Sequence, residues 1–375
     1  MKSVLVIGGG IAGYCAALGA RRDGAEATIV ARAPGATALY AGGMEVMDDL
    51  DQLLKSQANH PITRLGLDAF GLAGVLDIAV NTMQLALEKD GVRLEGDWRN
   101  RGLYADIHGL ARSANLVPAS VVGGSLRELA GRRVAVIGVP EVGDYDAAST
   151  AQALKELHGI DAFAEEVEIA DLPRSASLTD LYGRRAPIAA HARATSFAYP
   201  PGFTQLPPGG FELLAAPPSP HGWRLQQALG LGMIQGSITS FELAGDRIVS
   251  ARSAAKTFRA DAYVLATGRH IGGGLLGGRI TAEPLLGLGV FQDGRPAANA
   301  GVRLEHLRYL DPAAGLRSGL ITNRRLHPLD EEGQVAYSNL YAAGAVLSGF
   351  DGAGPHGFGV PIVTGWLAGR YAASS

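Results

Sequence analysis

The sequence predicts an α/β protein: a discontinuous Rossmann-like domain with an inserted α/β segment. Three observations predict this fold. An apolar strand runs into a glycine-rich turn and a small-residue helix over residues 3–22. A second strand and helix begin at residue 133, and a later meander leads into another buried strand. Strands alternating with helices are typical of parallel sheets. We expect the Rossmann-like domain in two parts, 1–120 and 223–375, around an inserted α/β cap or partner segment, 121–222.

Composition limits the function. The chain has 375 residues and a net charge of −3, which gives no general basic face for nucleic acid. Its 18% of charged residues is below the ~25% of ordinary soluble domains. Its one cysteine, Cys15, cannot form a disulfide, a Cys-x-x-Cys metal site or a redox dithiol within the chain. We read Cys15 as a packing residue on a buried helix, so any iron–sulfur chemistry must come from a partner.

The location expected from the sequence is the cytoplasm. The first strand begins at Ser3, without a basic region or a cleavage site before it. The longest uncharged runs, residues 333–350 and 352–369, are broken by Gly, Pro and Ser. We therefore expect no transmembrane helix, and membrane contact only through partners.

The N-terminal unit carries a phosphate-binding motif. Gly8, Gly10 and Gly13 form G-x-G-x-x-G between the first strand and a helix expected over residues 11–22. The first glycine permits a tight turn, the second lets the backbone approach a pyrophosphate, and the third lets helix and strand pack closely. Free N–H groups and the helix dipole favour an anion there. This motif predicts a dinucleotide or flavin phosphate at the start of the helix.

One part of the usual dinucleotide pattern is missing. An Asp or Glu commonly ends the second strand, where it binds a ribose hydroxyl. That strand is expected over residues 27–31, and the position holds Ala31 or Arg32. Arg32 can meet a 2′-phosphate, stack on an adenine or stay solvated. The distal half of the cofactor is therefore left open, with NADP among the alternatives.

The middle of the chain predicts a second α/β unit. A strand at 133–138 and a helix at 146–157 are followed by a further strand and a Pro-rich tract, 174–222. We expect this tract to be an irregular substrate cap or an exposed linker. The glycines after the strand lack the spacing of a dinucleotide motif, so no second dinucleotide site is expected. Helices are also expected over residues 45–58 and 72–89.

The Pro-rich tract holds a small basic cluster. A phosphate monoester would suit its charges, and a solvated or partner-facing patch is the alternative. The cluster consists of Arg184, Arg185, His191 and Arg193.

Two strands in the second half end in unusual ways. A meander from residue 234 leads into a strand over 263–266, which ends on a bare Thr267-Gly268. A later strand reads "NLYAAG", residues 339–344. In two-part flavoprotein folds, a strand ending Ala-Thr-Gly passes beside the cofactor, and the later strand brings the C-terminal segment to the flavin ring. The order of the meander and these two strands therefore favours a flavin nucleotide that lies against the backbone of Thr267-Gly268.

These stretches together resemble a known family. "VLVIGGGIAG", "RRVAVIGV", "DAYVLATGRHIGGGLLGGRITAEPLLGLGVF" and "NLYAAGAVLSGFDGAGPHGFG" resemble the B subunit of anaerobic glycerol-3-phosphate dehydrogenase. The resemblance implies a member of a three-subunit assembly that oxidises glycerol 3-phosphate and passes electrons through an iron–sulfur subunit to menaquinone. It implies FMN for the B subunit and FAD for the larger catalytic flavoprotein subunit. The complete glycine signature favours FAD here, with FMN as the alternative.

Candidate catalytic residues follow from this reading, and no metal ligands are expected. His270 can donate a proton or a hydrogen bond to the flavin, or be an exposed loop residue. His356 can take a substrate hydroxyl proton. Arg279 can hold a carboxylate or phosphate, or form a structural salt bridge. The expected cofactor-binding residues are Gly8, Gly10, Gly13, Arg32, Gly42, Gly43, Thr267, Gly268, Gly344, Asp351 and Gly357.

The function predicted is a flavin-dependent oxidoreductase subunit of a quinone-linked dehydrogenase for a small phosphorylated polyol or hydroxy acid. Its partners would be a catalytic flavoprotein subunit and an iron–sulfur subunit. One rival is a self-sufficient flavin dehydrogenase of a small hydroxy acid or dicarboxylate. A second is a non-catalytic docking subunit that keeps the flavin fold.

Overall fold

The computed structural model describes residues 1–33, 35–47, 49–188, 194–277, 282–292, 294–297, 317–352 and 357–375. Their contacts divide the chain into two compact units. Unit 1 comprises residues 1–37, 46–86 and 228–375, and unit 2 comprises 38–45 and 87–227. The sequence placed residues 87–120 in the Rossmann-like domain, whereas their contacts group them with the inserted segment.

Unit 1 is built on a five-stranded parallel sheet in the order β11-β2-β1-β15-β18. The strand that follows β1 pairs on one side of it, and a strand from the second half of the chain pairs on the other. This arrangement is a topological switch point, where open α/β sheets bind ligands. It confirms the expected fold class. The strands are β1 (Ser3–Ile7), β2 (Glu26–Ala31), β11 (Ile234–Gln235), β15 (Ala262–Leu265) and β18 (Leu340–Ala342).

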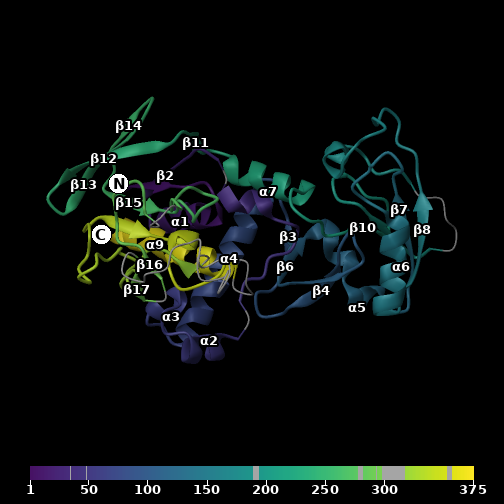
Figure 1. Cartoon of the computed structure of the whole chain (residues 1–375), viewed down its shortest axis with the longest axis horizontal. Helices are drawn as coiled ribbons and strands as arrows, with labels where there is room; N and C mark the ends of the chain where they lie inside the picture. Colours follow the sequence, from purple (N-terminus) through teal and green to yellow (C-terminus); the bar gives the residue numbers. More distant parts are fainter. Residues whose placement is uncertain are drawn as a thin grey trace. The chain divides into compact units, whose positions relative to one another are not determined.

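Helices α1 (Ile11–Arg22) and α9 (Gly359–Ser374) lie side by side in unit 1, although they come from opposite ends of the chain (Figure 1). Glycines let their backbones touch. A β-carbon at Gly369 would stand 1.9 Å from the carbonyl oxygen of Ala16. Cys15 is buried on the same helix, and burial raises the pKa of its thiol. A buried neutral thiol agrees with the packing role expected for it.

Helix α4 (Ala69–Lys89) is long and apolar enough to cross a membrane by length and composition, with a mean hydropathy of 1.5 over an 18-residue window. The expectation that no helix of this chain crosses a membrane stays a prediction, because core helices of soluble proteins meet the same criterion. The fully buried side chains of α4, Leu72, Leu76 and Met83, follow helical spacing, while Asp77 is exposed. This one-sided burial is the pattern of a core helix.

The other elements of unit 1 agree in part with the sequence. The helix expected over 45–58 forms only at α2 (Leu50–Ser56), followed by the short α3 (Pro61–Arg64). The meander is present as an antiparallel sheet of three strands. These strands are β12 (Ile238–Ala244), β13 (Arg247–Ser253) and β14 (Thr257–Phe258). A separate antiparallel pair consists of β16 (Phe291–Gln292) and β17 (Arg295–Pro296). Two short 3-10 helices are η1 (Gly35–Leu39), which continues into unit 2, and η5 (Gly344–Val346).

Unit 2 contains a second parallel sheet, in the order β10-β9-β7-β8, with α6 packed beside it (Figure 1). The Pro-rich tract is not merely an irregular cap or linker, because it contributes β9 and β10. Its short apolar stretches "SFAY" and "GFE" are buried between the prolines. The elements are β7 (Arg133–Gly138), α6 (Ala147–His158), β8 (Asp161–Glu166), β9 (Ser196–Tyr199) and β10 (Gly210–Glu212).

Short pairs of strands and turns complete unit 2. Strand β3 (Leu94–Gly96) pairs with β6 (Leu116–Pro118), and β4 (Gly102–Ala105) pairs with β5 (Ala111–Ala114). Helix α7 begins in unit 2 and its last residues belong to unit 1. The remaining elements are η2 (Ala119–Gly124), α5 (Leu126–Leu129), η3 (Leu178–Leu181) and α7 (Pro220–Gly230).

Candidate functional site

The glycine turn of unit 1 sits where two parallel strands end. Gly8 has a φ of +127°, and a β-carbon on it would stand 2.0 Å from the carbonyl oxygen of Ala266, at the end of β15. A β-carbon at Gly13 would stand 2.0 Å from the carbonyl oxygen of Gly8. The first glycine thus permits the tight turn, and the third permits the close packing of helix on strand.

The strand–helix pair β1–α1 differs from the pair β7–α6 in how the start of its helix is capped. Gly10 is the N-cap of α1, and no side chain caps this end, although the N–H of Ile11 donates to Thr37 Oγ1. Asp146, the N-cap of α6, instead accepts hydrogen bonds from two backbone N–H groups. The hydroxyl of Ser149 and these N–H groups lower the pKa of its carboxyl. A carboxylate already occupies the place that a phosphate would take at α6. Only α1, of these two, suits a phosphate.

The turn after β15 carries buried polar atoms that lack a partner. In the described chain, Thr267 Oγ1, Arg269 Nε and His270 Nε2 are buried without a hydrogen bond. Native proteins rarely leave such atoms unsatisfied. Gly268 has a φ of +73°, and a β-carbon at Gly274 would stand 2.5 Å from Thr267 Oγ1. The turn is therefore compact, and its free polar atoms fit a ligand beside the strand end.

Arg269 was not singled out from the sequence, yet it organises this side of unit 1. Its side chain is 8% exposed, and Nη2 donates to the carbonyl oxygens of Leu347 and Phe350, each at 3.0 Å. The guanidinium also lies 5.2 Å from the centre of the Phe350 ring. Burial lowers the pKa of Arg269 to about 10, and Asp351 opposes this. Arg269 thus fixes residues 347–351, called the strap below, beside the turn after β15.

These features fit a dinucleotide with a flavin. The uncapped start of α1 suits its phosphates, and Gly8 permits the tight turn that leads into this helix. The unpartnered Thr267 Oγ1 can hydrogen-bond to it. The strap containing Asp351 follows β18, as the C-terminal segment of a flavoprotein does.

The other expected cofactor residues are placed as follows. Arg32 is exposed directly after β2, at the position of the usual ribose acid. Gly344 is held by packing: a β-carbon there would stand 2.4 Å from Cβ of Ala12. Gly357 lies just before α9. The expected catalytic residues His356 and Arg279 lie outside the described residues.

Gly42 and Gly43 belong to unit 2, whereas the glycine turn belongs to unit 1. A β-carbon at Gly42 would stand 2.7 Å from both Cδ2 of His221 and Cδ2 of Leu214. One at Gly43 would stand 3.0 Å from Cβ of Ala114. Packing within unit 2 thus accounts for both glycines, and their cofactor role stays a prediction.

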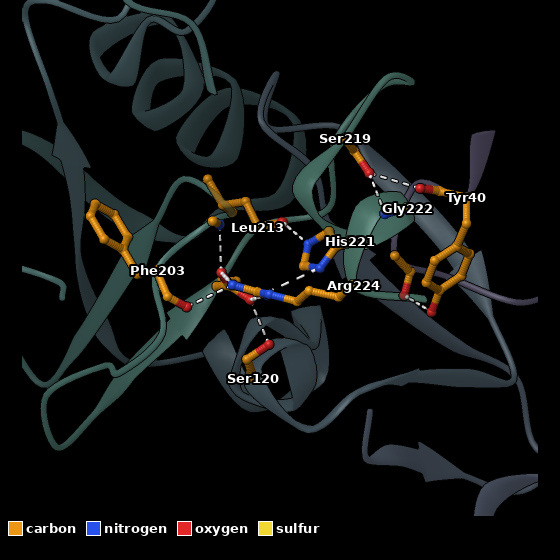
Figure 2. Close-up of polar contacts among 11 residues, drawn as sticks. Tyr40, Ser120, Phe203, Leu213, Ser219, His221, Gly222 and Arg224 are labelled. Atoms are coloured by element: carbon orange, nitrogen blue, oxygen red, sulfur yellow. Dashed lines mark hydrogen bonds and ion pairs between the residues drawn. The ribbon is translucent and has the colours of Figure 1, made fainter. Parts of the chain in front are cut away.

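Sequence reasoning missed a buried ionic network in unit 2 (Figure 2). Glu212 is fully buried at the end of β10, and its carboxylate accepts bonds from both Nη atoms of Arg224. It also accepts from Ser120 Oγ at 2.6 Å and from the N–H of Gly202 at 2.7 Å. Burial acts to raise the pKa of Glu212, but the hydrogen bonds and charge of Arg224 and the hydrogen bond from Ser120 outweigh it and lower the pKa. A carboxylate that accepts four hydrogen bonds is a poor base, which argues against a catalytic role. Because its donors come from separate segments of unit 2, the network stabilises the packing of that unit.

A neutral histidine, His221, lies beside the Glu212 carboxylate. Burial lowers the pKa of His221, against the opposing charge of Glu212. His221 Nε2 contacts the carbonyl oxygen of Leu213 at 3.0 Å, which assigns the proton to Nε2 (Figure 2). Its Nδ1 stands 3.9 Å from Glu212 Oε2. No local spacing in the sequence signals these contacts.

In the basic cluster of the Pro-rich tract, Arg184 is engaged with the backbone and Arg185 is exposed. Arg184 donates to the carbonyl oxygens of Asp180, Ala170 and Asp171, at 3.0 to 3.3 Å. Its guanidinium therefore braces a loop. His191 and Arg193 lie outside the described residues.

Comparison with known proteins agrees with the geometry. The FAD binding domain family matches residues 3–69 and 233–358, about half of the chain. A probable B subunit of the anaerobic glycerol-3-phosphate dehydrogenase of Halobacterium salinarum is 26% identical over all of this chain and 98% of its own length. The B subunit of the same enzyme of Yersinia pseudotuberculosis is 27% identical over 93% of this chain and 92% of its own.

Among the solved structures that the comparison finds is the 3-ketosteroid Δ1-dehydrogenase of Sterolibacterium denitrificans, 13% identical over the full length of both chains, with a TM-score of 0.44. The resemblance to the B subunits predicted from the sequence is confirmed by the two relatives above. The chain therefore belongs to the FAD binding domain family, and its cofactor is FAD, as the glycine signature predicted.

Proposed function

We propose that this chain is the flavoprotein B subunit of a quinone-linked glycerol-3-phosphate dehydrogenase, and that it relays electrons to an iron–sulfur partner. The observation that carries the proposal is the full-length similarity to proteins named as this subunit. The two relatives are matched over 98% and 92% of their own lengths, so the similarity is not confined to the FAD binding domain.

The geometry of unit 1 supports this role. Bound FAD can take up two electrons together and release them singly, which links substrate oxidation to an iron–sulfur centre. The uncapped start of α1 would hold the phosphates, and Thr267 Oγ1 would bond to the cofactor. Arg269 would keep the strap in place. His270, with its buried and unpartnered Nε2, would donate a hydrogen bond near the flavin.

The single cysteine supports the need for a partner. Cys15 is buried in α1, and the described residues hold no group of three metal-ligating side chains. An iron–sulfur cluster requires several cysteine ligands, so this chain would deliver electrons to a cluster bound elsewhere.

The first experiment is the absorbance spectrum of the purified full-length chain, with the released cofactor identified by mass. The proposal expects a yellow protein that releases FAD. The chain is then co-purified with its partners, and electron transfer from glycerol 3-phosphate to a quinone analogue is measured.

The outcomes separate the rival functions. Activity that needs both the partners and bound FAD supports the proposal. Dye reduction by the isolated chain with a hydroxy acid, but not with glycerol 3-phosphate, would favour the self-sufficient dehydrogenase. A complex that stays active when this chain has lost its FAD would make it a docking subunit.

A further inference from the structure

Helix α3 carries buried donors that lack an acceptor. Among the described residues, Thr63 Oγ1 and Arg64 Nε are buried without a hydrogen-bond partner. A buried donor left without an acceptor costs about 1–3 kcal/mol. Two such atoms on adjacent residues, in a protein that satisfies most of its polar groups, indicate that a ligand supplies the acceptors.

The charge of Arg64 is also unmatched. Its Nη2 donates to the neutral Asn59 Oδ1 at 3.1 Å, and no carboxylate among the described residues lies within ion-pair distance of it. Burial lowers the pKa of Arg64. A half-buried guanidinium of this kind favours an anionic ligand.

A second arginine lies against the turn that follows α3. A β-carbon at Gly66 would stand 2.7 Å from Nε of Arg324 and 3.1 Å from its Cζ. Gly66 therefore leaves the room that this guanidinium occupies. Within the described residues, Arg324 also has no carboxylate at ion-pair distance. Two guanidinium groups that have no counterion in the described part of the chain thus flank the end of one short helix.

The turn that presents Arg324 is rigidly built. Asn323 Oδ1 accepts hydrogen bonds from the N–H groups of Arg325 and His327. Leu326 is fully buried with a φ of +65°, a conformation that costs free energy in a residue with a side chain and often marks functional sites. Arg325 lies over the ring of Tyr371 instead, at 5.5 Å. The two adjacent arginines therefore differ in their surroundings.

Contacts connect α3 to the strap. A β-carbon at Gly349 would stand 2.1 Å from the carbonyl oxygen of Asn59. The ring of His60, the N-cap of α3, lies 5.9 Å from that of Phe350. Arg269 in turn holds Phe350 beside the turn after β15. A ligand at α3 would therefore bind near the strap and the expected flavin.

We propose that Thr63, Arg64 and Arg324 form an oxyanion subsite that takes the phosphate group of the substrate. This rests on the proposed function, which supplies a phosphate monoester as the substrate. Guanidinium and hydroxyl donors match phosphate oxygens. Unlike Arg184, whose guanidinium donates to three backbone carbonyl groups, these side chains have donor atoms to offer.

The test is calorimetric titration of the FAD-loaded full-length chain with glycerol 3-phosphate, inorganic phosphate and glycerol. R64Q and R324Q are compared with R325Q, a matched control beside Arg324. We expect wild type to bind both phosphates but not glycerol. R64Q and R324Q should each weaken phosphate binding tenfold or more, because a hydrogen bond to a charged group is lost. R325Q should stay within twofold of wild type.

Two results would overturn the subsite. One is equal affinity for phosphate in wild type, R64Q and R324Q. The other is loss of FAD from R64Q or R324Q but not from R325Q, which would assign the donors to the cofactor's phosphates. The proposed function fails separately: if glycerol 3-phosphate reduces no flavin in the assembled complex while phosphate binding still depends on both arginines, the subsite holds and the dehydrogenase assignment does not.

Discussion

A β-carbon at Gly8 would stand 2.0 Å from the carbonyl oxygen of Ala266, a residue that lies far away in the sequence. This contact joins the glycine turn after β1 to the strand end that precedes Thr267-Gly268. It explains why position 8 carries no side chain. The carbonyl group of Ala266 occupies the space that a β-carbon on Gly8 would need.

Gly8→Ala should abolish FAD binding, because the new methyl group would collide with the backbone at Ala266. Gly24→Ala is a matched control, since Gly24 also has a positive φ, +82°, but open space around it. The control should lose about 1 kcal/mol of stability from backbone strain alone and keep its FAD. FAD per chain, read from absorbance, checks both. Equal FAD loss in the two variants would show that strain, not the collision, matters.

Arg269→Met should loosen the strap, because Leu347 and Phe350 lose the donor to their carbonyl oxygens. We expect FAD affinity to fall about tenfold, as hydrogen bonds to a charged group are removed. Arg370→Met removes a half-buried arginine that is paired with Asp23 in the same unit and serves as the control. Fluorescence titration with FAD measures the difference. Unchanged affinity in Arg269→Met would separate the strap from cofactor binding.

Glu212→Gln should destabilise unit 2 by about 3 kcal/mol, because it leaves the Arg224 guanidinium without its buried counterion. Glu242→Gln breaks an exposed pair with Arg252, 3.7 Å apart, and should cost less than about 1 kcal/mol. Urea unfolding followed by circular dichroism compares the two. A similar loss for both would mean that the buried network contributes no more than a surface pair.

Acid should destabilise the protein in two windows. The folded pKa of His221 is lowered, so the unfolded state binds more protons once the pH falls below about 6.5, and stability is lost there. The folded pKa of Glu212 is also lowered, so its contribution is present above its ordinary value of 4.5 and is lost below it.

His221→Gln tests the upper window, because glutamine does not titrate. Melting temperatures between pH 7 and pH 5 should fall less steeply in this variant than in wild type. A slope identical to that of wild type would assign the acid sensitivity to other histidines.

Much of the local structure could be read from the sequence. The first strand, helix α1 and strand β7 form where the apolar runs and glycines place them, within a residue. These patterns are local: a strand run, a helical spacing and a glycine turn act over a few residues. The same locality carried the FAD prediction, because the phosphate-binding turn is one short stretch. Prediction from local patterns failed in the Pro-rich tract, because β9 and β10 are too short to show the alternation of apolar and polar residues that marks a strand.

By itself, then, the sequence determined the Rossmann-like fold and the FAD turn. Only the tertiary structure decided that residues 87–120 belong to unit 2, that Arg269 holds the strap, and that Glu212 is buried against Arg224. It also separated Arg324 from Arg325, which look alike in sequence. The physical reason is that a charge or a donor takes its role from what is packed around it, and those neighbours come from distant parts of the chain.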